Sequence, residues 1–264
     1  MNNTFNEDEF DKLFEEDDDV VNNLQKIIIQ QRLEEEKTKL DKYGGRLGDL
    51  FKCVGTFLKK HEQSIPPYRI TGGAAVSAWL NPKNENIPKD QLQYLITSDW
   101  DIEILGNNEQ ALDLAKRIKR YLVKECGKNN ITDRFNTVVV MSGEELKGLH
   151  VYQIGLDDIN ETRYFVDVHG QIEDNFQKNN IVKLDGLRYP NLKTLITDTE
   201  KCMVGEKMVK RYSRVELLKN AIQDIKMFNP DVYREICQQC ISKGVENLTG
   251  FNLNCNALKK LCES

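Results

Sequence analysis

Two segments decide the fold of this chain: Tyr68-Arg69-Ile70-Thr71-Gly72-Gly73-Ala74-Ala75 and, after a polar spacer, Ser98-Asp99-Trp100-Asp101-Ile102-Glu103-Ile104-Leu105. In the second segment acidic residues alternate with large apolar ones, which is the period of a β-strand with one buried face. The other face then carries a row of carboxylates that repel one another. Since Asp99 and Asp101 lie about 6 to 7 Å apart on that face, both can reach the same divalent cations. The pattern therefore indicates a Mg²⁺ site for phosphates.

The glycine pair lies between a predicted strand at 68–70 and a predicted short helix at 74–80. Glycines at the start of a helix let the backbone approach a ligand closely. The helix N-terminus also offers amide groups and a favourable dipole to an anion. Gly72 and Gly73 are therefore predicted to bind a triphosphate, and Ser98, next to the acids, is grouped with them.

A third acid, Asp167, occurs in another alternating segment, Arg163-Tyr164-Phe165-Val166-Asp167-Val168-His169. The order Gly-Gly, helix, Asp-x-Asp and later Asp resembles the signature of the nucleotidyltransferase superfamily of polymerase-β type, over about residues 47–170. The resemblance implies an α+β fold with a mixed β-sheet core and flanking helices. The chain departs from the family pattern in two places: no Ser or Thr directly follows Gly73, and the spacer before Asp99 is longer than in the compact members.

The resemblance also implies a mechanism. Asp99, Asp101 and Asp167 are the predicted catalytic and metal-binding residues, with Mg²⁺ or Mn²⁺ as the cofactor. Asp99 and Asp101 would bind the metal that accompanies the triphosphate. Together with Asp167 they would bind the metal that activates an acceptor hydroxyl for in-line attack on the α-phosphorus. We interpret Glu103, one step further along the same face, as a supporting or structural acid. His169 is assigned to the opposite face of its strand, outside the site.

The remaining patterns predict an alternation of helices and strands around this core. Amphipathic segments predict helices at 49–61 and 109–126, and apolar runs predict strands at 135–141, 149–156 and 164–168. Residues 187–196 read as a Pro-marked turn that leads into helices at about 192–207, 210–228 and 231–243. The predicted organisation is an acidic tail and charged helix (1–45), a nucleotidyltransferase core (46–186) and a C-terminal helical region (187–264).

A basic stripe occurs in the C-terminal region, where Lys207, Lys210, Arg211 and Arg214 recur at helical spacing. It is a solvated face or, where it faces the cleft, a binding site for triphosphate or primer phosphates. The Lys-x-x-Lys-Arg-Tyr-x-Arg segment, the long spacer and the Tyr-Pro-x-Leu-x-x-Leu pattern resemble the poly(A) polymerase-like catalytic proteins of large cytoplasmic DNA viruses. That resemblance implies a nucleoside triphosphate, ATP first, as substrate and RNA as partner, in the host cytoplasm or the virion.

Composition limits the partners and the compartment. The 264 residues carry a net charge of −5 and a sequence pI near 5.5, so the chain is not a general polyanion binder and any nucleic-acid contact must be a local patch. The sequence has no run of eighteen apolar residues, so we expect a soluble, intracellular protein with no membrane partner. The seven scattered cysteines favour a reducing compartment.

Two further segments leave alternatives open. Four cysteines could be read as a zinc site, although a helical pattern around the first two favours core positions; they are Cys237, Cys240, Cys255 and Cys262. The acidic N-terminal segment is interrupted by Phe5, Phe10, Leu13 and Phe14 at helix-like spacing. It is a solvated tail or a docking segment for a protein partner.

Three classes of function remain for the core. The first is an enzyme that adds nucleotides to an RNA 3′ end. The second transfers a nucleotide to a small molecule, a tRNA or a protein, which the acidic pI favours. The third is a non-catalytic module that keeps the fold and binds a partner; the intact Asp99, Asp101 and Asp167 speak against it.

Overall fold

The computed structural model describes residues 46–80, 95, 97, 99–126, 139–141, 150–157, 162–171, 180–201, 208–223, 229 and 231–235. The chain divides into two compact units, Met1–Gly45 and Arg46–Ser264, and every described residue belongs to the second unit. The acidic tail, Ser98, Lys207 and the four cysteines of the zinc alternative lie outside the described residues.

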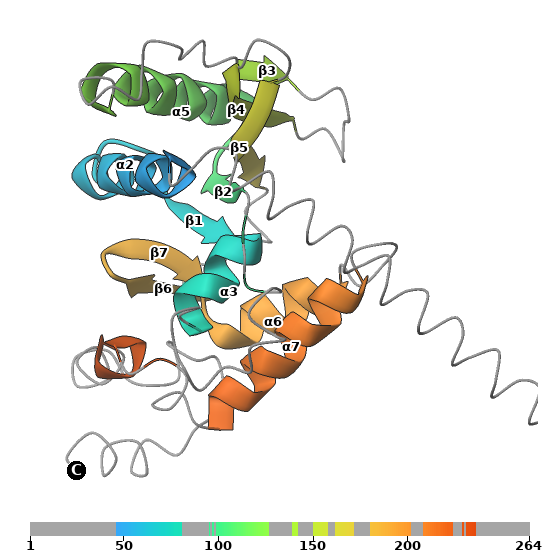
Figure 1. The fold of residues 1–264 in the computed structure, drawn as a ribbon. Coiled ribbons are helices and arrows are strands. Elements are labelled where there is room, and N and C mark those ends of the chain that lie inside the picture. The colour runs from blue at the N-terminus through green and yellow to red at the C-terminus, as the bar shows by residue number, and fades with distance from the viewer. Residues whose placement is uncertain are drawn as a thin grey trace, which may run out of the picture. The chain divides into compact units, whose positions relative to one another are not determined.

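A five-stranded sheet forms the centre of this unit, with the strand order β1-β2-β5-β4-β3 (Figure 1). The central strands β2 and β5 run parallel, and the other neighbouring pairs are antiparallel. The strands are β1 (Tyr68–Thr71), β2 (Trp100–Leu105), β3 (Val139–Met141), β4 (Val151–Asp157) and β5 (Thr162–Gln171). The predicted mixed sheet with flanking helices, and with it the α+β fold class, is confirmed.

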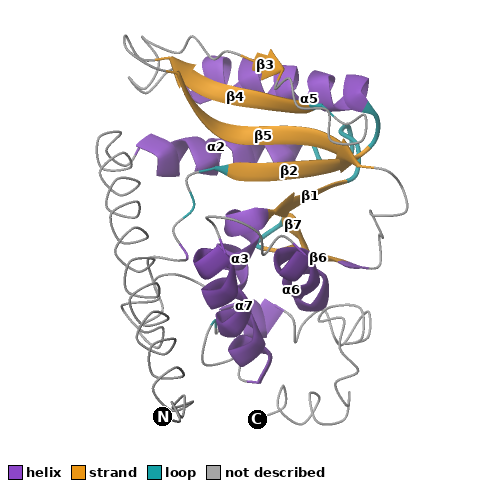
Figure 2. Ribbon diagram, turned by 90° about the vertical axis from the view of Figure 1, so that its right-hand side faces the viewer, coloured by secondary structure: helices purple, strands orange, loops and turns teal. Residues whose placement is uncertain are grey.

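Two helices cover one face of the sheet, as Figure 2 shows behind the strands: α2 (Arg46–Lys60) and α5 (Asn108–Tyr121), which continues as the π-helix η2 (Leu122–Cys126). On this face the side chains of Ile102 and Ile104 are fully buried. Phe51 of α2 stacks on Trp100, with ring centroids 5.2 Å apart and an interplanar angle of 6°. Because side chains alternate along a strand, burial of this face sends Asp101 to the other one.

The second layer of the unit packs beside the first strand. Helix α3 (Gly72–Leu80) follows β1 directly, and the indole of its Trp79 donates a hydrogen bond to the carbonyl of Pro190 at 3.0 Å. Helices α6 (Leu192–Lys201) and α7 (Met208–Gln223) pack against each other and against α3. Asn229 fastens the C-terminal end of α3, because its side-chain amide donates to the carbonyls of Ala78 and Trp79.

The structure corrects the prediction for residues 187–196. A hairpin of β6 (Ile181–Leu184) and β7 (Leu187–Pro190) precedes α6. Its turn is formed by Asp185 (φ 46°) and Gly186 (φ 72°), the pair of left-handed residues that a tight two-residue hairpin requires. Pro190 pairs with Ile181 at the end of the strand, where a missing N–H is tolerated. Asn191 then accepts a hydrogen bond from the Thr194 amide, which starts α6.

The structure also bears on two expectations for the whole chain, the lack of a membrane span and the state of the cysteines. No helix of the described residues is long and apolar enough to span a membrane. Cys53 in α2 is disulfide-bonded, which differs from what the expected reducing compartment would favour. Sequence spacing gives no sign of this bond, because it depends on which cysteines the fold brings together.

Candidate active site

The turn between β1 and α3 fits only glycine at its first position. Gly72 has φ 62°, a left-handed conformation that other residues adopt at a cost. A Cβ atom there would collide with Oδ2 of Asp101. The backbone of the turn and the carboxylate of Asp101 are therefore packed directly together, as expected of a site where Gly-Gly and Asp-x-Asp act jointly.

The register of the sheet brings two of the predicted acids side by side. Asp101 on β2 pairs with Asp167 on the parallel strand β5. Thr71 pairs with Asp101 from the other side, so the end of β1 leads into the glycine turn beside them. Neighbouring strands lie about 4.8 Å apart, so a single ligand can contact both carboxylates, which are half-buried.

The carboxylate of Asp167 is held from the next strand. Gln153 on β4 is its register partner, and the Gln153 side-chain amide donates a hydrogen bond to Oδ1 of Asp167 at 3.1 Å. The register thus places three polar residues in a row across neighbouring strands: Asp101 on β2, Asp167 on β5 and Gln153 on β4. Gln153 was not among the predicted site residues, although a glutamine among the apolar residues of its strand is a usable sign.

The loop before β2 is fastened to the glycine turn. The Thr97 hydroxyl donates a hydrogen bond to the backbone carbonyl of Asp99 at 2.7 Å. The same hydroxyl oxygen lies 2.9 Å from the position that a Cβ on Gly73 would take. Thr97 therefore fixes the backbone of Asp99 next to the turn. Its role was not predicted from the sequence, because it depends on contacts across the spacer.

A cation from the C-terminal region reaches the same turn. Nη2 of Arg214, on α7, lies 2.8 Å from the position of a Cβ on Gly73. Lys210 and Arg211, four and three residues before it, share its side of the helix and are also partly buried. Of the predicted basic stripe, these three are therefore placed on a helix that packs on α3, and Arg214 is brought to the glycine pair.

A second polar row lies beside the first and is an internal ion network. Arg69 on β1 is 4% exposed, and its guanidinium donates to Oε2 of Glu103 at 2.5 Å. Its Nη2 lies 3.7 Å from Oδ2 of Asp198 on α6. Burial raises the pKa of Asp198, against the opposing effect of Arg69. Glu103 is thus engaged by Arg69 and ties β2 to β1, which agrees with the structural role that the sequence predicts.

The assignment of His169 to the opposite face is wrong. It is the register partner of Glu103, and its Nε2 lies 4.0 Å from Oε1 of that residue. Residues two apart on a strand point the same way, so His169 shares the face of Asp167.

Carboxylates of this kind suit Mg²⁺. Among the described residues, no group of three or more His, Cys, Asp or Glu is gathered so that it could hold a metal ion. The register places two carboxylates, Asp101 and Asp167, side by side. Mg²⁺ is commonly bound by one or two carboxylates together with water and substrate phosphate oxygens, so the donor set fits it when a triphosphate is present.

Similarity to known proteins is found among solved structures. No family model and no curated protein matches the chain. Among solved structures, it is similar to the Megavirus polyadenylate synthase, with a TM-score of 0.47 and 14% identity over 86% of this chain and 43% of that one.

Two structures from Helicobacter pylori are similar as well. One is the protein JHP933, with a TM-score of 0.42 and 10% identity over 82% of this chain and 91% of that one. The other is assigned as a nucleotidyltransferase, with a TM-score of 0.42 and 11% identity over 82% and 95% of the two chains. This chain thus spans less than half the length of the Megavirus protein and most of the length of the bacterial ones.

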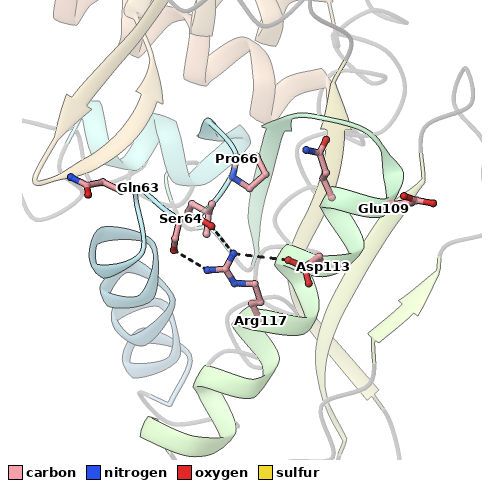
Figure 3. A pocket seen from close by; sticks show the side chains of 8 residues that line it. Gln63, Ser64, Pro66, Glu109, Asp113 and Arg117 are labelled. Carbon is pink, nitrogen blue, oxygen red and sulfur yellow. Dashed lines mark hydrogen bonds and ion pairs between the residues drawn. The ribbon is translucent and has the colours of Figure 1, made fainter.

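A hollow of about 580 Å³ lies apart from these residues, between the loop before β1 and helix α5 (Figure 3). Arg117 crosses it and donates to the carbonyl and hydroxyl oxygens of Ser64 at 2.7 and 3.0 Å, and it lies 4.0 Å from Asp113. The guanidinium therefore holds the loop on α5. The hollow adjoins the Tyr68 end of β1, whereas the carboxylates adjoin the Thr71 end.

Proposed function

We propose that this chain is a metal-dependent nucleotidyltransferase that adds nucleotides from a nucleoside triphosphate to the 3′ end of RNA. The observation that carries the proposal is the contact between the left-handed Gly72 and Asp101, with Asp167 as the neighbour of Asp101 in the sheet. A close glycine turn suits a phosphate chain, and paired carboxylates suit the cation that accompanies it.

The basic residues of α7 would complete the triphosphate site. The start of α3 offers backbone amides at Gly72 and Gly73, and the guanidinium of Arg214, on α7, reaches the turn at Gly73. Lys210 and Arg211 share its helix face, so we assign all three to the phosphates of the incoming nucleotide, with ATP as the expected substrate. Guanidinium groups bind phosphate oxygens through two donors at once.

Asp101 and Asp167 would hold Mg²⁺ or Mn²⁺, and we assign Asp99 as the third acid of the site. When bound, the metal neutralises charge on the triphosphate and lowers the pKa of the attacking hydroxyl. The chain's own contribution is to fix these acids. Thr97 holds the backbone of Asp99, Gln153 holds the side chain of Asp167, and the glycine turn confines Asp101. Such positioning brings acceptor and α-phosphorus into line.

The test is incorporation of each labelled nucleoside triphosphate into a short RNA primer, with Mg²⁺ or Mn²⁺, by the wild type and by Asp101→Asn and Asp167→Asn. Asp113→Asn, an exposed acid on α5, is the matched control. We expect extension by the wild type and the control, and a loss of at least about a hundredfold in either site variant. Incorporation without RNA would point to another acceptor. An unchanged rate in both site variants would overturn the assignment of the acids.

A further inference from the structure

Four cations gather on the helices that cover the back of the sheet. They form what we call the rear basic surface: Lys60 on α2 and Lys116, Lys119 and Arg120 on α5. Three of them are exposed and Lys119 is partly exposed. No carboxylate of the described residues lies within ion-pair distance of any of the four, so their charge is not neutralised within that part of the chain.

Four neighbouring cations on α2, α5 and η2 behave differently. Each has an acidic partner: Lys52 with Asp49, Lys59 with Asp185, Arg117 with Asp113 and Lys124 with Glu125. The chain as a whole has a net charge of −5. The same side of α5 also carries the exposed acids Glu109 and Asp113, seven and three residues before Lys116. The cations still outnumber these acids, and this local positive excess in an acidic protein attracts a polyanion.

The two helices that carry these cations pack against each other. The Lys60 ammonium lies 6.0 Å over the ring of Tyr121, which packs on Phe57 with ring centroids 5.3 Å apart. This contact places the end of α2 against the end of α5. Lys116, Lys119 and Arg120 follow at spacings of three and four residues, so their attachment points are about 5 to 6 Å apart on one side of α5. These three cations form a row on α5, and Lys60 lies beside the row, at Tyr121.

Neither the helix dipoles nor a protein partner accounts for the whole of this surface. Cations in the last turn of a helix are favourable to its dipole, and this covers Lys119, Arg120 and Lys60 but not Lys116 in mid-helix. A protein partner needs an apolar centre in its interface. Of the described large hydrophobic residues on α5 and η2, Val123 alone counts as exposed, at 46%. Charge without apolar area suits a phosphate backbone.

We infer that the rear basic surface binds the phosphate backbone of RNA at a distance from its 3′ end; the choice of RNA rests on the proposed function. Figure 2 shows α2 and α5 behind the sheet, and the alternation of side chains along β2 and the register with β5 place Asp101 and Asp167 on the opposite face. An RNA strand that reaches both the acids and the rear basic surface must therefore pass around an edge of the sheet. It must span the thickness of the sheet and of one helix layer, on the order of 20 Å. The surface binds long RNA and leaves a short primer unaffected.

The test compares a triple variant with a matched triple control. Lys116→Gln, Lys119→Gln and Arg120→Gln remove three charges from the surface. Lys52→Gln, Lys219→Gln and Arg234→Gln remove three exposed cations that already have acidic partners. Both proteins carry Asp101→Asn, and binding is measured without nucleotide or metal. The probes are a short oligoadenylate, one several times longer, and poly-glutamate of similar charge.

We expect the surface variant to bind the long RNA on the order of tenfold more weakly than the control, with a salt slope lower by about two. Binding of the short RNA should be equal. Equal affinity and slope for the long RNA in both proteins would overturn the inference, as would poly-glutamate that binds as well as RNA. Circular dichroism confirms folding. Because these proteins carry Asp101→Asn and only binding is measured, the result does not depend on catalysis. If the wild type extends no primer while the long RNA still binds at this surface, the proposed function is refuted and the inference stands.

Discussion

Oδ2 of Asp101 lies against the backbone of Gly72, at the place where any other residue would carry its Cβ. The strand that carries the acid and the turn that begins α3 are thereby closed on each other. The contact places an acidic oxygen beside the N-terminus of α3, where the helix dipole favours negative charge.

Gly72→Ala should destabilise the fold and abolish triphosphate binding. The left-handed φ of 62° costs a non-glycine residue about 1 to 2 kcal/mol, and the collision with Asp101 adds to it. Gly48→Ala is the control, because nothing lies within 4 Å of a Cβ at that helical position. It should be neutral or stabilise by up to about 1 kcal/mol. Urea denaturation and nucleotide binding check both; a Gly72→Ala protein as stable as Gly48→Ala would contradict a collision at this turn.

Gln153→Met should lower the rate of transfer by about ten- to a hundredfold, because it removes the donor that orients Asp167 and keeps a similar volume. We expect weaker binding of Mn²⁺ in the presence of a triphosphate, measured by electron paramagnetic resonance, with folding unchanged. Gln63→Met, in the hollow near α5, is the control. Metal binding and rate equal to those of the control would show that Gln153 does not position the acid.

Arg69→Met should destabilise the protein by about 3 kcal/mol, because it leaves the carboxylate of Glu103, whose side chain is only 13% exposed, without its cation. The double variant Arg69→Met/Glu103→Gln removes the charge as well as its partner, and it should recover part of the loss. Chemical denaturation at neutral pH measures both. A double variant no more stable than the single one would mean that packing, rather than the unpaired charge, causes the effect.

Glu62 should make stability depend on pH in the acidic range. A hydrogen bond from Lys183 lowers the pKa of Glu62 from its ordinary 4.5, a second from Arg188 adds to this, and burial opposes both. The carboxylate therefore stabilises the fold above pH 4.5, and this contribution is lost as the pH falls through the lowered pKa.

Glu62→Gln should cost on the order of 1 kcal/mol at pH 7, and its difference from the wild type should vanish well below pH 4. Urea denaturation at several pH values measures this, with Glu109→Gln, an exposed acid on α5, as the control. A difference that persists at low pH would assign the effect to packing between the β6–β7 hairpin and the end of α2.

The sequence by itself determined the elements of the core and the acids on its open face. Alternation of acidic and apolar residues from Asp99 to Leu105 is a local property of the chain, and a strand turns it directly into one buried and one polar face. The glycine pair likewise predicted a tight turn, because the left-handed conformation of Gly72 is strained for residues that carry a Cβ atom. Asp167 was found because its own segment alternates in the same way.

The tertiary structure alone decided which residues meet. Gln153 lies beside Asp167 because the register of β4 on β5 puts it there, and Arg214 reaches Gly73 because α7 packs on α3. The ion network of Arg69, Glu103 and Asp198 arose in the same way. Strand register and helix packing are set by burial of whole faces against one another, so contacts between distant residues follow from the assembled core and not from any single stretch of sequence.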